Sequence, residues 1–251
     1  MKTKFIINAD DLGMSANVNS AILKCMEQGL ISDTSIIVTE RESFDELKSI
    51  DKSILDFSAG VHLCLTRGNS LSGKLDFMCD QEGFFKGKLS SSNLYQYRKE
   101  IFDEFCHQIE EVKKLGLQIS HLDSHQHIHM RIDLLPIAIR CCKEFKIPYL
   151  RRPSYSYHDR LKSIVYSKMR SKMIRLMGVK TVDYFGDYKQ VNNSYNTKFR
   201  YVEVMCHPAF TSNFNIVDKK KNISFDECDL LTDHLDALPK DKELIKFKEL
   251  L

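Results

Sequence analysis

The sequence lacks the signals of several common protein classes. None of its apolar runs approaches the ~20 residues of a membrane span, and the first apolar run is too short for a signal peptide. Basic and acidic residues nearly balance, at 37 against 34, so the net charge of +3 does not by itself indicate nucleic-acid binding. Internal repeats and an interdomain linker are also missing. We therefore expect one domain spanning residues 1–251, with enough core to fold without disulfides or structural metals.

Two further sequence motifs are absent, and their absence bears on the cellular compartment and on nucleotide binding. The eight cysteines form no Cys-x-x-Cys pair, and several lie inside apolar runs, as buried free thiols do. This distribution predicts a reducing compartment, and with no signal peptide the expected location is the cytoplasm. The first apolar run is followed by neither a Gly-x-Gly-x-x-Gly nor a Walker sequence, which argues against nucleotide binding.

Short β-branched or apolar runs alternate with helical patterns along the chain. We expect strands at 4–9, 34–38, 57–65, 119–123, 149–151, 180–185, 201–206 and 244–247, and helices at 15–29, 43–50, 93–115, 133–145, 159–177 and 226–238. This alternation predicts an α/β fold with a largely parallel sheet. The strand number and chain length favour a barrel, complete or distorted, over an open doubly wound sheet. Residues 66–88 have no clear period and are expected to form a long functional loop.

The most unusual stretch is 120–130, which reads SHLDSHQHIHM. Its polar residues fall at every second position, so an extended strand would place them all on one face: His121, Asp123, His125, His127 and His129. A His-rich solvated edge strand and a metal site at a strand end both fit this pattern. In an extended chain His121 and His129 would lie roughly 26 Å apart, so one ion could use only one or two of the five.

Other polar residues follow predicted strands in the same way. Asp10 and Asp11, His62, Arg151 and His207 all lie where a strand is expected to end. In parallel α/β folds, sites assemble at the carboxyl ends of strands. Each residue alone has an ordinary explanation, such as a turn or helix cap for the Asp pair or a satisfied core histidine. Together they suit an open metal site of one carboxylate and two imidazoles, which could activate a water for hydrolysis.

Four blocks of the sequence resemble, in order, the signature blocks of the YdjC-like carbohydrate deacetylases. They are NADDLG at 8–13, GVHLCLT at 60–66, HLDSHQHIH at 121–129 and EVMCHPAF at 203–210. This family includes chitooligosaccharide deacetylases and is similar in logic to the NodB-type polysaccharide deacetylases. The resemblance therefore implies a single-domain α/β fold of NodB-like architecture, a distorted (β/α) barrel.

The resemblance also implies a set of site residues. One divalent metal ion would be held by Asp11, His62 and His125, with Mg²⁺ expected from the family and Zn²⁺ or another transition metal as alternatives. Asp10 would be the catalytic base and, by analogy with NodB-type enzymes, His207 the general acid. The run Arg151-Arg152-Pro153 resembles the Arg-x-Pro element that orients the base in that wider group. Four residues are expected to contact the substrate or support the site: Asp123, His127, His129 and Arg151.

The function implied is metal-dependent hydrolysis of an N-acetyl group from an acetylated amino sugar or short chitooligosaccharide, as in chitin degradation. The expected partner is this small sugar, with no nucleic acid and no membrane, and a homodimer is left open. One alternative is a metal-dependent phosphoesterase, which would usually need two metals and more Arg or Lys. The other is a non-catalytic sugar- or metal-binding protein, which would keep His62 and His125 but have no use for Asp10.

Overall fold

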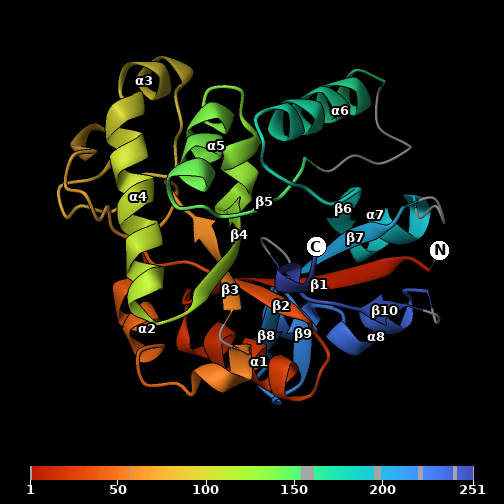
Figure 1. Ribbon diagram of the computed structural model, residues 1–251. Coiled ribbons are helices and arrows are strands. Elements are labelled where there is room, and N and C mark those ends of the chain that lie inside the picture. Colours follow the sequence, from red (N-terminus) through yellow and green to blue (C-terminus); the bar gives the residue numbers. More distant parts are fainter. Residues whose placement is uncertain are drawn as a thin grey trace.

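A curled parallel sheet forms the centre of the structure, a computed structural model that describes residues 2–56, 58–153, 161–194, 199–219, 223–239 and 242–250 (Figure 1). Its strand order is β5-β4-β3-β2-β1-β7-β6. The strands are β1 (Lys4–Leu12), β2 (Asp33–Ile36), β3 (Ser58–Leu63), β4 (Gln118–Ser124), β5 (Tyr149–Leu150), β6 (Tyr184–Asp187) and β7 (Tyr201–Cys206). A short β10 (Glu243–Leu244) pairs with the beginning of β1. The α/β class with a largely parallel sheet is therefore confirmed.

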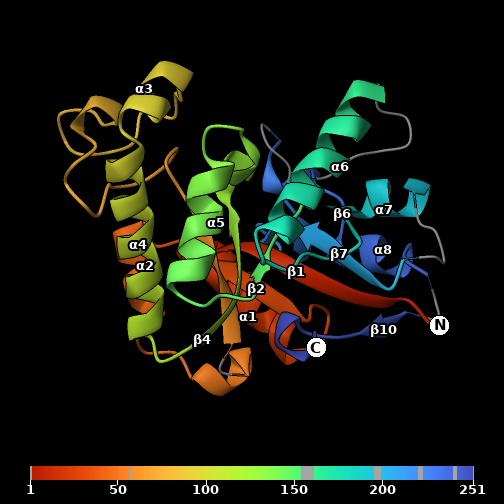
Figure 2. The ribbon, with the colours of Figure 1, turned by 45° about the horizontal axis from the view of Figure 1, so that its top comes forward.

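Helices surround this sheet, some packed on its strands and others on neighbouring elements (Figures 1 and 2). They are α1 (Ala16–Glu27), α2 (Arg41–Glu46), α3 (Ser91–Gln96), α4 (Arg98–Lys114), α5 (Leu135–Glu144), α6 (Leu161–Leu176), α7 (Tyr188–Ser194) and α8 (Leu231–Asp236). Short 3₁₀ turns occur at Lys52–Leu55, Asp76–Met78, His125–Met130, Phe225–Glu227 and Phe247–Glu249. Beyond β7, the strands β8 (Pro208–Phe210) and β9 (Ile216–Asp218) form a separate antiparallel pair, and β8 packs against α1.

The sheet curls far enough to bring its two edges together. The amide of Leu150, in edge strand β5, donates to the carbonyl of Lys180, which precedes edge strand β6. Lys180 in turn donates its amide to the carbonyl of Pro148. These bonds nearly complete a ring of strands, and the expected distorted barrel is confirmed.

The two faces of the sheet have different surroundings. Along β1, Phe5 and Ile7 belong to the main apolar core, whereas Ile6 contacts Tyr149 and Phe185 from the two edge strands. Residues from opposite edges can meet only on the concave side of the curl. Because side chains alternate along a strand, Asn8 and Asp10 follow Ile6 onto this concave side. The concave side is thus apolar at the amino ends of the strands and polar at their carboxyl ends.

His121 belongs to the amino-end, apolar layer of this concave side. Its ring is fully buried and stacks on Phe247, with ring centroids 3.9 Å apart. A β-carbon placed on Gly60 would lie 2.3 Å from its Nε2, so the ring occupies space that only a glycine leaves open. Burial lowers the pKa of His121 to about 3, and the neutral ring packs in the core and belongs to neither group of candidate metal ligands found among the described residues.

The strand expected at 119–123 is present as β4, but the extended conformation ends at Ser124 and does not continue through the following histidines. A 3₁₀ turn begins at His125, and both Gln126 and His127 have a φ of 54°. Such left-handed conformations reverse the alternation of side chains, so the histidines do not share a face. The amide of His129 donates to the Ser124 hydroxyl, a local contact across the turn that the alternating pattern does not reveal.

The helical spacing of apolar residues predicts a core face for the helix expected at 159–177, and this prediction is wrong for all of them: Leu161, Val165, Met169, Met173 and Leu176. The apolar residues at core spacing are exposed, at 75% for Leu161 and 76% for Leu176. Ile174 is buried instead, together with two serines whose hydroxyls donate to backbone carbonyls, Ser167 to Pro153 and Ser171 to Ser167. The first two residues of the expected helix lie outside the described residues. The helix expected at 93–115 is present, but it is divided into α3 and α4 at Tyr97.

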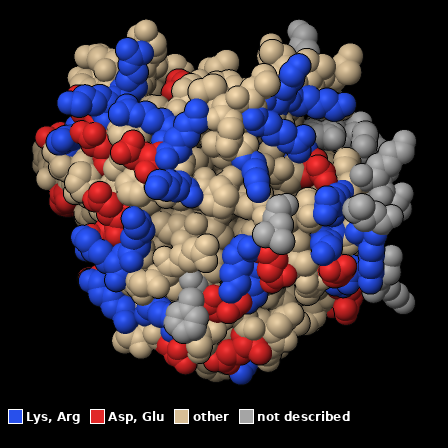
Figure 3. Space-filling view, in the orientation of Figure 1, with Lys and Arg blue, Asp and Glu red and all other residues tan. Residues whose placement is uncertain are grey.

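The surface agrees with the balanced composition. On the face shown in Figure 3, Lys and Arg side chains lie in separate groups, with Asp and Glu side chains among them. Within the described ranges, none of the helices combines the length and apolar character needed to cross a membrane.

Candidate active site

Most of the sequence-predicted site residues line one pocket at the carboxyl ends of the strands, whereas Asp123, His129 and Arg151 lie outside its lining. The cavity has a volume of about 320 Å³. It is lined by Asp10, Asp11, Met14, His62, Arg67, Ser124, His125, Gln126, His127, Met205, His207 and Lys219. Strands β1, β3 and β7 and the turn after β4 therefore all contribute to it. This convergence is what the parallel topology predicts for polar residues that follow strands.

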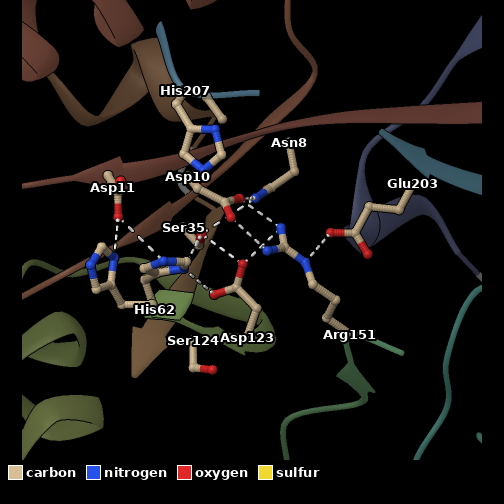
Figure 4. A network of polar contacts seen from close by, with 12 residues as sticks. Asn8, Asp10, Asp11, Ser35, His62, Asp123, Ser124, Arg151, Glu203 and His207 are labelled. Carbon is tan, nitrogen blue, oxygen red and sulfur yellow. Dashed lines mark hydrogen bonds and ion pairs between the residues drawn. The ribbon is translucent and has the colours of Figure 1, made fainter. Parts of the chain in front are cut away.

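Asp11 points toward His62 (Figure 4), and His125 contacts the same carboxylate oxygen of Asp11. Oδ1 of Asp11 lies 3.3 Å from Nε2 of His62 and 3.1 Å from Nδ1 of His125. The three ligand atoms all lie within 4.8 Å of one another. Ligands that each bond a divalent ion at ~2.1 Å lie roughly 3 Å apart, so the spacing fits one ion. Burial opposes ionisation of Asp11, but the hydrogen bonds with His125 and His62 hold its pKa well below the usual range.

The backbone of β1 separates the two adjacent carboxylates. Its pairing with β2 shifts register between Ala9 and Leu12, and Asp11 has a φ of 75°. This irregularity turns the Asp11 side chain toward the histidines, while Asp10 keeps the regular alternation and faces the concave interior. Two neighbouring residues can therefore serve different partners.

Asp123 fixes the orientation of His62. Oδ1 of Asp123 lies 2.7 Å from Nδ1 of the ring, and the Ser35 hydroxyl lies 3.1 Å from the same nitrogen. With Nδ1 engaged, Nε2 is left directed at Asp11. A carboxylate behind a histidine in this way sets its tautomer and raises its basicity, as is usual at metal sites.

Arg151 lies under the pocket and binds three carboxylates (Figure 4). It donates two hydrogen bonds to Asp10, of 2.6 and 2.7 Å, one from each terminal nitrogen. A terminal nitrogen also lies 2.8 Å from Asp123, and Nε donates to Glu203 at 2.6 Å. All four side chains are at most 1% exposed. Burial would favour a neutral Asp10, but the charge of Arg151 outweighs this and lowers the pKa of the carboxyl.

A second trio could in principle hold an ion, because Asp10, His62 and Asp123 also bring ligand atoms within 4.8 Å. Arg151 already donates to both carboxylates, and Nδ1 of His62 is engaged by Asp123. A cation there would have to displace a fully buried guanidinium. The trio of Asp11, His62 and His125 is therefore the better candidate metal site.

His207 follows β7 and reaches the same pocket. Its side chain is 32% exposed, so a substrate could approach it. Its amide donates to Oδ1 of Asp218 at 2.7 Å, and its Nδ1 lies 3.8 Å from the same oxygen. Burial disfavours the charged ring, but Asp218 and the charges of Asp10 and Asp11 outweigh it and raise the pKa of His207.

The remaining histidines of the stretch differ in their surroundings. His129 is fully buried, and its Nε2 lies 3.2 Å from the carbonyl of Arg151. Burial lowers its pKa to about 3, so the neutral ring supports the turn and the Arg151 backbone without reaching the pocket. His127 lines the pocket and contacts Phe185 edge-on, and burial lowers its pKa to about 4.

The sequence patterns assign no role to several residues that the structure places at the site. Glu203 and Ser35 are polar residues within apolar strands, which is a signal that could have identified them. Asp218 follows no comparable pattern, because its importance depends on the pairing of β8 with β9. Arg67 and Lys219 line the pocket from loops, whose course a sequence pattern does not give.

Comparisons with known proteins agree with this geometry. A family model described as YdjC-like protein matches residues 4–240. A Vibrio cholerae protein named carbohydrate deacetylase is 30% identical over 214 residues, which cover 82% of this chain and 79% of the relative. One of the same name from Oceanobacillus iheyensis is 29% identical over 232 residues, covering 87% of this chain and 89% of the relative.

A solved structure shares the fold. It is a protein from Enterococcus faecalis described as a candidate cellobiose-phosphate cleavage protein, with a TM-score of 0.71 and 21% sequence identity. The alignment covers 100% of this chain and 99% of the other. At this identity the likeness concerns the fold alone.

Glu203 gives a testable dependence of stability on pH. Burial raises its pKa to about 8; Arg151 opposes the shift, and Asp123 and Asp10 add to it. Its Oε2 has no hydrogen-bond partner among the described residues. A carboxyl in the unfolded chain loses its proton near its ordinary pKa of 4.5. Between these two values the folded state therefore holds the extra proton, and stability falls as pH rises.

We expect Glu203→Gln, whose side chain is always neutral, to remove this contribution. The free energy of unfolding of the wild type, minus that of the variant, should fall by up to ~1.4 kcal/mol per pH unit across this window. Urea unfolding of both proteins, treated with a chelator, measures the difference between about pH 5 and pH 8. Parallel curves for the two proteins would show that Glu203 is ionised in the folded state.

Proposed function

Because the chain belongs to the YdjC-like protein family, we propose that it is a metal-dependent carbohydrate deacetylase. The proposed reaction removes the N-acetyl group from an acetylated amino sugar or short chitooligosaccharide, and one domain spanning residues 1–251 carries it out. The observation that carries this proposal is the convergence of the Asp11, His62 and His125 ligand atoms beside a carboxylate, Asp10, that Arg151 holds in the same pocket.

Asp11, His62 and His125 would hold the ion. A divalent cation at this point would polarise the acetyl carbonyl and lower the pKa of a water molecule. Two imidazoles and one carboxylate suit zinc and other first-row transition metals, whereas magnesium prefers oxygen ligands. This donor set favours a transition-metal ion over the Mg²⁺ that the family resemblance implies.

Asp10 is the proposed base. Arg151 keeps the carboxylate ionised and fixes both of its oxygens, so it needs no rearrangement to accept a proton. Its lowered pKa makes it a weak base, adequate only for a water that is already acidified. Asn8 donates a further hydrogen bond to Asp10 at 2.8 Å and contributes to the same orientation.

His207 is the proposed acid. An amide nitrogen leaves a tetrahedral intermediate as a very poor anion, so the departing amine must receive a proton. The carboxylates around His207 raise its pKa and favour the protonated ring that this step requires. Its partly exposed position at the pocket wall supports contact with the substrate.

The two alternative functions receive less support. A two-metal phosphoesterase would need a second ion, and Arg151 fills the second trio of candidate ligands within the described part of the chain. A protein that only binds sugar or metal would have no use for an ionised Asp10 carboxylate in the pocket beside the candidate metal ligands.

Acetate release tests the proposed function. The metal-free protein, prepared with a chelator, should release no acetate from N-acetylated mono- and disaccharides, and adding back Zn²⁺, Mn²⁺, Co²⁺ or Mg²⁺ should restore turnover. The donor set predicts a transition metal as the best activator. Phosphate release from sugar phosphates without any acetate release would instead favour the phosphoesterase.

The division of labour between the two aspartates gives a further prediction. Asp10→Asn should retain the metal and lose turnover, because an amide cannot accept the proton of the water. Asp11→Asn should lose metal affinity as well. Metal titration followed by calorimetry separates the two, and equal loss of affinity in both variants would contradict the assignment.

His207→Ala should keep its metal and lose at least ~10²-fold in turnover, the range expected for a positioned acid. In the wild type the rate should fall as pH rises through the pKa of His207, and this high-pH limb should disappear in the variant. An activated aryl acetate, whose leaving group needs no proton, serves as the control substrate. Equal slowing of both substrates would mean that His207 positions the substrate rather than donating a proton.

A further inference from the structure

A second, buried histidine lies behind His207. His234, in α8, has its Nδ1 3.1 Å from Oδ2 of Asp218 and its Nε2 3.3 Å from Oδ2 of Asp229. The ring of Tyr188, in α7, stacks on it with centroids 3.5 Å apart and planes 17° apart. The imidazole is therefore held at both nitrogens and on one face, although it does not reach the pocket.

Asp218 connects this ring to the pocket. Its Oδ1 accepts the amide of His207 and lies 3.8 Å from the His207 ring, while its Oδ2 faces His234. The pairing of β8 with β9 keeps the two segments together, because Pro208 is opposite Asp218 and the amide of Lys219 donates to the carbonyl of His207. One carboxylate thus places one oxygen against each histidine.

The hydrogen bond from His234 restricts how the Asp218 carboxylate can turn. Carboxylate oxygens only accept hydrogen bonds, so Nδ1 of His234 must carry the proton between them. Without this donor, Oδ2 would be left in a nearly buried position with one partner fewer, at a cost in desolvation. The carboxylate could reduce this cost by rotating, and the rotation would move Oδ1 away from His207.

We propose that His234 is a positioning residue for His207, acting through Asp218. This inference rests on the proposed function, because it assumes that His207 donates a proton to the departing amine. The Nδ1–H of His234 fixes the plane of the Asp218 carboxylate, which in turn holds the His207 backbone through its amide and keeps one oxygen at ion-pair distance, 3.8 Å, from the ring that faces the substrate nitrogen. A displaced donor would lower the rate of the chemical step without changing how the substrate or the metal is bound.

Two isosteric variants separate the two arms of His234. In His234→Asn the amide nitrogen takes the place of Nδ1 and can still donate to Asp218. In His234→Gln the amide nitrogen takes the place of Nε2 and faces Asp229 instead. We expect the Asn variant to keep kcat on an N-acetylated disaccharide within about twofold. The Gln variant should lose about tenfold or more in kcat, with KM and metal affinity unchanged, the scale seen when a residue that orients a site residue is replaced.

Three controls accompany the pair. Asp229→Asn removes the carboxylate from the other arm and should leave kcat near the wild-type value. His234→Phe keeps the stacking on Tyr188 without any donor, so it should behave like the Gln variant and replaces it if that variant does not fold. An activated aryl acetate should be hydrolysed by all variants at nearly wild-type rates.

The outcomes are distinguishable. The inference is overturned if Asn and Gln lose kcat equally, if Gln and Phe match the wild type, if the loss falls on KM, or if the aryl acetate slows to the same extent. Wild-type protein that releases no acetate with any metal would contradict the proposed function itself, before any variant is compared.

Discussion

The buried guanidinium of Arg151 is the constraint on which the rest of the site depends. Asp10 and Asp123 come from different strands and would repel one another in a dry interior, and Glu203, from a third strand, contacts the same guanidinium. Arg151, directly after β5, bonds all three and so joins four strands of the curled sheet. Removing one partner of such a buried cluster costs roughly 3–5 kcal/mol, because the remaining charges are left uncompensated. The same contacts that orient Asp10, the proposed base, are therefore contacts that hold the sheet in its curl.

The cluster also explains why a cation suits the neighbouring position. Burial disfavours a charged His62, but Asp123, Asp11 and Asp10 together raise its pKa well above the ordinary value. The carboxylates thus create a negative field at Nε2 of His62 that favours a bound positive charge. In the absence of an ion that charge is a proton, whereas a divalent ion would replace the proton and use the same field. Arg151 cannot exchange a proton for a metal ion in this way, because a guanidinium is not deprotonated in proteins.

The sequence predicts the parts of the site that depend on regular alternation. Polar residues after apolar runs were expected at strand ends, and a parallel sheet brings strand ends together. Asp11, His62, His125 and His207 do line one pocket. The turn at His125 was not predictable, because alternating histidines look the same whether the chain stays extended or turns, and the contact between Ser124 and His129 decides. The prediction of the buried face of helix α6 is wrong for a related reason. Helical spacing shows which residues share a face, but it does not show which face of the helix packs against the core. Glu203 is visible as a charge in an apolar strand, yet its partner Arg151 lies 52 positions away and only the fold joins them.

The adjacent carboxylates show how one backbone irregularity divides two functions. In a regular strand Asp10 and Asp11 would face opposite sides of the sheet, and Asp11 would point away from the pocket. The register shift and the left-handed φ of Asp11 return its side chain to the pocket. A left-handed residue other than glycine costs of order 1–3 kcal/mol, and such strain persists only where surrounding contacts determine it. Here those contacts are the two histidines, since both hydrogen-bond the same oxygen of Asp11. A glycine at this position would relieve the strain but remove the only carboxylate of the ligand trio, so the strain and the ability to hold an ion belong together.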